Sequence, residues 1–189
     1  LARRAKEEND STNAAKYYSK FLEENPNSWE ARFYSAYYQA LNCKVIEAPS
    51  MCTKLTKLAE PILTAIKDNE TEENQTKYVV EVAEKMYDIS ILFEKGNSSK
   101  ASGFVPTMLL TWGAKLEKIY PENTEIINQA VKFWMKVIDM FSEMRGTGVP
   151  AIEDGIKELT EKIQKYNGEY TPTESKITQH TSDSPNRLY

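Results

Sequence analysis

Residues 72–94 read EENQTKYVVEVAEKMYDISILFE, and their apolar side chains recur every three or four positions. An α-helix repeats every 3.6 residues, so this spacing puts the apolar side chains on one face. The residues of that face are Val79, Val82, Ala83, Met86, Ile89 and Phe93. Glu72 and Glu73 stand at the start of the stretch, where carboxylates suit the positive end of a helix dipole. The stretch therefore predicts one long helix with a single buried face.

The same helical period continues on both sides of this stretch, and no segment shows the period of two that is typical of strands. Prolines and polar turn residues separate the periodic segments, and Ser28 is placed to cap one of the helices. Pro61 lies inside another and predicts a kink or a split into two helices. The predicted helices cover residues 1–8, 13–24, 29–42, 51–67, 72–94, 104–119, 125–143 and 151–166. The expected fold class is all-α, with about eight antiparallel helices and short connections.

We expect residues 1–167 to form a single all-helical domain. A chain of 189 residues buries roughly 70% of its unfolded surface, so it needs no disulfide or metal to fold. In residues 168–189 bulky aliphatic side chains almost vanish, which predicts a flexible or weakly docked polar tail. Because Leu1 begins the sequence within helical sequence, we interpret the chain as a fragment of a longer protein.

Charge and composition restrict the function classes. Lys and Arg number 24 and Asp and Glu 28, a net charge of −4, whereas proteins that bind nucleic acid usually carry a basic excess. No apolar run is long enough to span a membrane. We therefore expect no nucleic-acid partner and no membrane insertion. Cys43 and Cys52 lack the spacing of a metal site, and we interpret them as core residues of a reduced, cytoplasmic chain, with a bridge between them left open.

The sequence shows no catalytic motif. Catalysis needs a nucleophile, an acid or base, or a metal in defined geometry, and the common catalytic and nucleotide-binding signatures are missing. The only histidine, His180, lies in the polar tail. We therefore predict that the chain is not an enzyme and uses no metal or cofactor. The alternative is a polar pocket that combines Asp139 or Glu143 with tyrosines.

Aromatic residues are concentrated between residues 17 and 38. In the predicted helix 29–42, the pairs Phe33/Tyr37 and Tyr34/Tyr38 form two adjacent stripes at i,i+4 spacing. Together the stripes cover a wide arc. Either both are buried between neighbouring helices, or part of the arc faces a groove that binds a partner.

Small and aromatic residues near the N-terminus also have a recognisable spacing. The residues that carry it are Ala2, Ala5, Ala14, Tyr18, Phe21, Pro26 and Ala36. Over about residues 1–42 this spacing resembles a tetratricopeptide repeat. The resemblance implies a stack of helical hairpins, with small residues where helices cross and with Tyr18 and Phe21 filling the gap beside them. Beyond residue 42 the pattern fades, so we expect the repeat-like start to continue into an irregular helical bundle.

The resemblance also implies a binding surface, because the first helix of each such repeat lines a concave face. Transferred to this sequence, that groove includes Arg3, Lys6, Glu30, Phe33, Tyr34 and Tyr37. Tyr and Arg are favoured at binding hot spots. The expected function is a non-catalytic scaffold that binds a protein or peptide.

Self-association into a homo-oligomer is the alternative function, as a structural module of a larger bacterial protein. An apolar seam on the last predicted helix, formed by Ile152, Ile156, Leu159 and Ile163, would favour it if it is exposed. The narrow spacing of these residues also suits one flat packing contact with the preceding helices.

A second resemblance involves AAKYY at residues 14–18 and NPNSWEA at 25–31. These segments are similar to the helical region of uncharacterised bacterial proteins in which that region follows a short zinc-ribbon segment. This chain holds no zinc-ribbon cysteines, and the resemblance implies no activity.

Overall fold

The computed structural model describes residues 1–96, 103–144 and 150–172. Within these ranges the chain forms eight α-helices and one short 3-10 turn, η1, and it contains no strand. The all-α fold class expected from the helical periodicity is confirmed. The elements are α1 (Ala2–Glu7), α2 (Ser11–Glu24), α3 (Trp29–Leu41), η1 (Val45–Glu47), α4 (Ala48–Asn69), α5 (Glu72–Gly96), α6 (Phe104–Ile119), α7 (Thr124–Glu143) and α8 (Pro150–Gln164).

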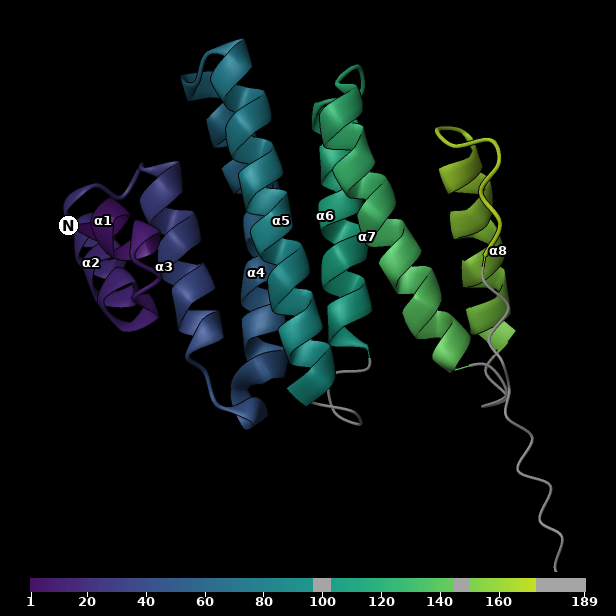
Figure 1. The fold of residues 1–189 in the computed structure, drawn as a ribbon, viewed down its shortest axis with the longest axis horizontal. Helices are drawn as coiled ribbons and strands as arrows, with labels where there is room; N and C mark the ends of the chain where they lie inside the picture. The colour runs from purple at the N-terminus through teal and green to yellow at the C-terminus, as the bar shows by residue number, and fades with distance from the viewer. Residues whose placement is uncertain (97–102, 145–149, 173–189) are drawn as a thin grey trace, which may run out of the picture.

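The helices form an elongated row in chain order, from α1 and α2 at one end to α8 at the other (Figure 1). Each helix packs against the next one in the chain, and α3, α4 and α5 also pack against the helix two places further on. In Figure 1 the chain rises through α4, descends through α5 and continues to alternate as far as α8. The buried apolar residues come from all eight helices. The apolar interior therefore extends along the whole row.

Side-chain caps fix where three of the helices begin. The side chains of Asp10, Ser28 and Asn123 each accept a hydrogen bond from the backbone N–H three residues further along the chain. Such an N-cap satisfies one of the backbone donors that have no partner inside the helix, and it typically contributes about 1 kcal/mol. The cap expected at Ser28 is confirmed.

Two prolines lie within α4, and neither ends it. Pro49 occupies the first turn, where the backbone N–H groups have no partner within the helix and a proline therefore costs no hydrogen bond. The helix begins at Ala48, before the expected residue 51. Pro61 lies in the interior, yet the helix continues through it as one element, and the predicted split is wrong. Proline has no backbone N–H, so Pro61 cannot donate the helical hydrogen bond to the carbonyl of Lys57, four residues earlier. Both residues are exposed, so this unmade bond lies on the solvent side of the helix.

The aromatic stripes of α3 are buried. The exposed fractions of Phe33, Tyr34 and Tyr37 are 0%, 1% and 5%. Phe33 stacks on Tyr37 and meets the edge of Trp112 of α6, with ring centroids 6.2 Å apart. The stripes are covered because α2, α4 and α5 all pack against α3. Of the two alternatives left by the sequence, the structure therefore shows the one in which the arc is core.

The apolar seam of α8 is buried as well. Ile152, Ile156, Leu159 and Ile163 are all shielded from solvent, and α8 packs against α7. The packing contact with a preceding helix that the spacing suited is therefore present, and the exposed seam that would favour self-association is absent at these four positions.

The first residues of the predicted tail contact the last helix. Tyr170 is partly buried against the core, and its carbonyl accepts a hydrogen bond of 3.0 Å from the side chain of Gln164. The remainder of the tail, residues 173–189 with His180, lies outside the described residues.

Gly113 sets the distance between α6 and α7. A methyl group at this position would lie 2.5 Å from Nε1 of Trp134, a fully buried side chain. Overpacking of this kind costs about 1–3 kcal/mol, which exceeds the gain of up to about 1 kcal/mol in helix propensity. We expect Gly113→Ala to lower the free energy of unfolding by about 1–2 kcal/mol, measured by urea denaturation with circular dichroism.

Gly155→Ala is the matched control in α8. There the methyl group would meet the ring of Phe141 at 3.1 Å, and Phe141 is only partly buried, so the ring can move. This substitution should leave stability unchanged or raise it slightly. Equal losses in the two variants would contradict the close approach at Gly113.

Candidate partner-binding site at the N-terminal end

A groove lies between α1 and α2 at the N-terminal end of the row. Its cavity has a volume of about 530 Å³. Its walls come from α1, α2 and the start of α3. The residues that line it include Leu1, Arg3, Tyr17, Lys20, Phe21 and Glu24. The groove thus combines apolar side chains with charges of both signs.

The register of α2 explains these apolar walls. Tyr17 and Phe21 are four residues apart and therefore share one side of the helix, whereas Tyr18 points into the interior and is buried. The exposed fraction of Phe21 is 40%, although the tetratricopeptide resemblance implied that it would fill the gap beside the small residues. Phe21 therefore lies at the groove rather than in the core.

The first polar contact of α1 joins Arg3 to Glu30 of α3. The Arg3 Nη2 lies 2.6 Å from a Glu30 oxygen, and the Tyr18 hydroxyl donates to the same carboxylate over 2.9 Å. Burial alone would raise the pKa of Glu30, but the hydrogen bonds from Arg3 and Tyr18 outweigh it and lower the pKa. The carboxylate is therefore held in its charged form.

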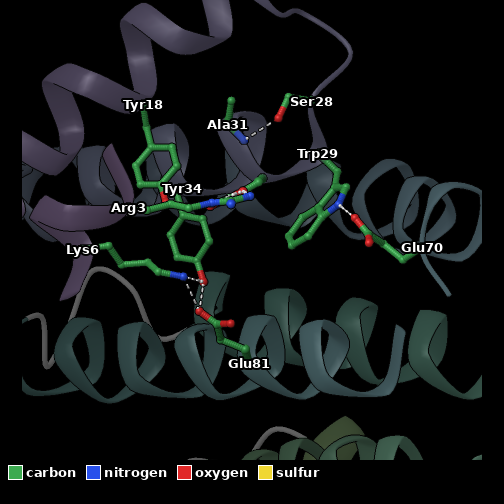
Figure 2. Close-up of polar contacts among 10 residues, drawn as sticks. Arg3, Lys6, Tyr18, Ser28, Trp29, Ala31, Tyr34, Glu70 and Glu81 are labelled. Carbon is green, nitrogen blue, oxygen red and sulfur yellow. Dashed lines mark hydrogen bonds and ion pairs between the residues drawn. The ribbon is translucent and has the colours of Figure 1, made fainter. Parts of the chain in front are cut away.

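The second polar contact joins Lys6 to Glu81 of α5. The Lys6 ammonium lies 2.7 Å from a Glu81 oxygen, and the Tyr34 hydroxyl donates to the same oxygen. Figure 2 shows Lys6 and Tyr34 both directed at Glu81, with the ammonium 4.5 Å from the centre of the Tyr34 ring. Burial raises the pKa of Glu81, but the bonds from Lys6 and Tyr34 outweigh it and lower the pKa. Burial, followed by the bond to Glu81, raises the pKa of Tyr34.

The structure divides the six residues of the predicted groove. Arg3 and Glu30 line the groove between α1 and α2. Phe33, Tyr34 and Tyr37 are buried, so the predicted groove does not exist at those positions, because neighbouring helices cover them. Lys6 does not line the groove, and its ammonium contacts Glu81 and the hydroxyl of Tyr34.

Sequence reasoning did not place Tyr17, Phe21 or Lys20 in the groove, or Glu81 beside Lys6. The i,i+4 spacing of Tyr17 and Phe21 is a signal that could have paired them. Glu81 offers none, since it is one of several carboxylates on a long amphipathic helix.

The other residues with possible catalytic, redox or metal-binding chemistry form no site in the described ranges. Asp139 and Glu143 are both exposed on α7, and Cys43 and Cys52 are free thiols, so the bridge left open between them is not formed. Across 1–96, 103–144 and 150–172, no three His, Cys, Asp or Glu side chains are grouped to hold a metal ion. Within the same ranges no helix is long and apolar enough to cross a membrane.

No family model, no curated protein and no solved structure matches this chain. The resemblances to tetratricopeptide repeats and to zinc-ribbon-bearing bacterial proteins therefore stay predictions.

The two paired carboxylates should make the stability of the fold sensitive to acid. The pKa values of Glu30 and Glu81 lie below the usual 4.5 in the folded state, so the unfolded chain binds more protons as the pH falls. Their contribution is present at neutral pH and is lost below about pH 4.5. We expect the free energy of unfolding to fall less between pH 7 and pH 3 in Glu30→Gln/Glu81→Gln than in the wild type, measured by urea denaturation at each pH.

The control for this experiment is Glu23→Gln/Glu84→Gln, which removes two exposed carboxylates from α2 and α5. Its pH dependence should follow the wild type. If both double variants flatten the curve to the same extent, the contacts of Glu30 and Glu81 are not the source of the effect.

Proposed function

We propose that this chain is a non-catalytic helical scaffold that binds a segment of a protein or peptide in the groove between α1 and α2. The observation that supports it is the half-exposed ring of Phe21 beside a cavity of about 530 Å³. Pockets that bind small molecules have volumes of about 300–1,000 Å³, so this groove has room for a few side chains of a bound segment. The ring of Phe21 in the wall of the groove offers apolar surface that a bound partner would bury.

The polar residues around the ring favour a protein segment as the ligand. Lys20 and Glu24 are exposed on α2, and Arg3 reaches the groove from α1. Protein interfaces commonly have an apolar centre with a polar rim, and aromatic and Arg side chains dominate their binding energy. The mixed signs suit a partner segment that also carries both charges.

Self-association has less support. The seam from Ile152 to Ile163 on which it depended is buried against the neighbouring helix. The groove at the other end of the row is therefore the better-supported surface.

A displayed peptide library, panned against the immobilised 189-residue chain, tests this function. Peptides selected on the wild type should rebind it and bind Phe21→Ala about 30-fold more weakly, because truncating a hot-spot residue costs about 2 kcal/mol. Affinity is measured by interferometry, after circular dichroism has shown unchanged helix content.

Leu92→Ala is the matched control, since Leu92 of α5 is 46% exposed and does not line the groove. It should leave the affinity of the selected peptides unchanged. A library that yields no binders, or binders equally sensitive to both substitutions, would refute the groove as the binding surface.

A further inference from the structure

We propose that α1 is a tethered occupant of an acidic, tyrosine-lined site formed by α3 and α5, and that a basic helical segment of a partner displaces it. This site adjoins the groove between α1 and α2 and shares Glu30 with it. It does not require the groove or Phe21, so it stands independently of the function proposed above.

The charges on α1 are spaced to reach two other helices. Arg3 and Lys6 are three residues apart, which places both cations on one face, about one helical turn apart. They reach carboxylates on two different helices, Glu30 of α3 and Glu81 of α5. The two carboxylates are therefore positioned to receive a helix with cations at i and i+3.

Residues outside α1 form the site that receives these cations. Tyr18 and Tyr34 each donate a hydroxyl hydrogen bond to one of the two carboxylates, and both tyrosines are buried. The Tyr34 ring lies beneath the Lys6 ammonium at 4.5 Å (Figure 2). Oriented carboxylates and an aromatic face are the groups that bind ammonium and guanidinium ions.

Few residues of α1 are buried in the apolar interior. Among Ala2–Glu7, Ala5 is buried and Ala2 is partly buried against the core. The Arg3 side chain is 75% exposed and its partner Glu30 is 14% exposed, so water screens the cation of this ion pair more than the carboxylate. The helix can leave its site while the interior from α3 to α8 stays packed.

These observations define the chemistry of the displacing partner. It is a helix that carries Arg or Lys at i and i+3, with a small residue at i+2 where Ala5 meets the interior. Such a helix competes with α1, which the three residues 8–10 tether to α2. The tether gives α1 a high effective concentration at the site, so the site is open in a small fraction of the molecules. The apparent affinity for the partner is reduced in proportion to that fraction. The wild type therefore binds the partner weakly.

The experiment uses the 189-residue chain and a fluorescein-labelled, alanine-rich helical peptide of about 20 residues with Leu-Ala-Arg-Arg-Ala-Lys at its centre. Binding is followed by fluorescence anisotropy at low salt. Arg3→Met/Lys6→Met removes the two competing cations from α1, so this variant should bind the peptide at least about tenfold more tightly than the wild type. Glu30→Gln/Glu81→Gln should abolish binding.

The control on the same helix is Arg4→Met/Glu8→Gln. These two exposed residues pair with each other at 2.8 Å and should leave the affinity of the wild type unchanged. Phe21→Ala should also bind the peptide as the wild type does, and loss of binding there would assign the peptide to the groove and overturn the proposal. Two further results would overturn the proposal. One is that Arg3→Met/Lys6→Met binds the peptide no more tightly than Arg4→Met/Glu8→Gln does. The other is that the peptide still binds Glu30→Gln/Glu81→Gln.

A second probe covers the case in which Glu30→Gln/Glu81→Gln is shown to be unfolded by circular dichroism. The same peptide with Glu in place of its central cations is titrated into Arg3→Met/Lys6→Met. Binding of the basic peptide and no binding of the acidic one supports the site. Equal binding of the two, or no binding of either, rejects it.

Discussion

The structure depends on the burial of α3 on every side. All six consecutive positions from Phe33 to Tyr38 are buried, and a helix that is apolar all round must be covered all round. Helices α2, α4 and α5 provide that cover. The row of helices follows from this requirement, because a helix enclosed on several sides brings together neighbours that are distant in sequence.

Burying tyrosines has an electrostatic consequence that reaches the N-terminus. A buried hydroxyl needs a hydrogen-bond partner, and Tyr18 and Tyr34 find theirs in the carboxylates of Glu30 and Glu81. A desolvated carboxylate in turn needs a cation. Arg3 and Lys6 supply the two cations, so the buried tyrosines add polar contacts to the packing of α1 against α2.

The sequence predicted the helices because their signals are local. The periodicity of residues 72–94 and the cap at Ser28 depend on neighbours within a few positions, and the structure contains both. The burial of the α3 stripes is different, because a wide aromatic arc is the same pattern whether a helix or a partner covers it. Lys6 and Glu81 are 75 positions apart, and only the packing of α3 between α1 and α5 brings them together. The fold class was thus accessible from the sequence, and most of the site was not.

The two proposed surfaces at the N-terminal end would be coupled, because Glu30 belongs to both and Arg3 of α1 lines the groove while it pairs with Glu30. Under the two proposals, a ligand that fills the groove against Phe21 and touches Arg3 would stabilise α1 in its seated position. A basic helix that binds Glu30 and Glu81 removes α1, and the wall of the groove that α1 forms is lost with it. Each ligand therefore lowers the affinity of the other, by the same factor in both directions, since coupling between two equilibria is reciprocal. The two proposed binding events would oppose each other because α1 forms a wall of the groove and also occupies the acidic site.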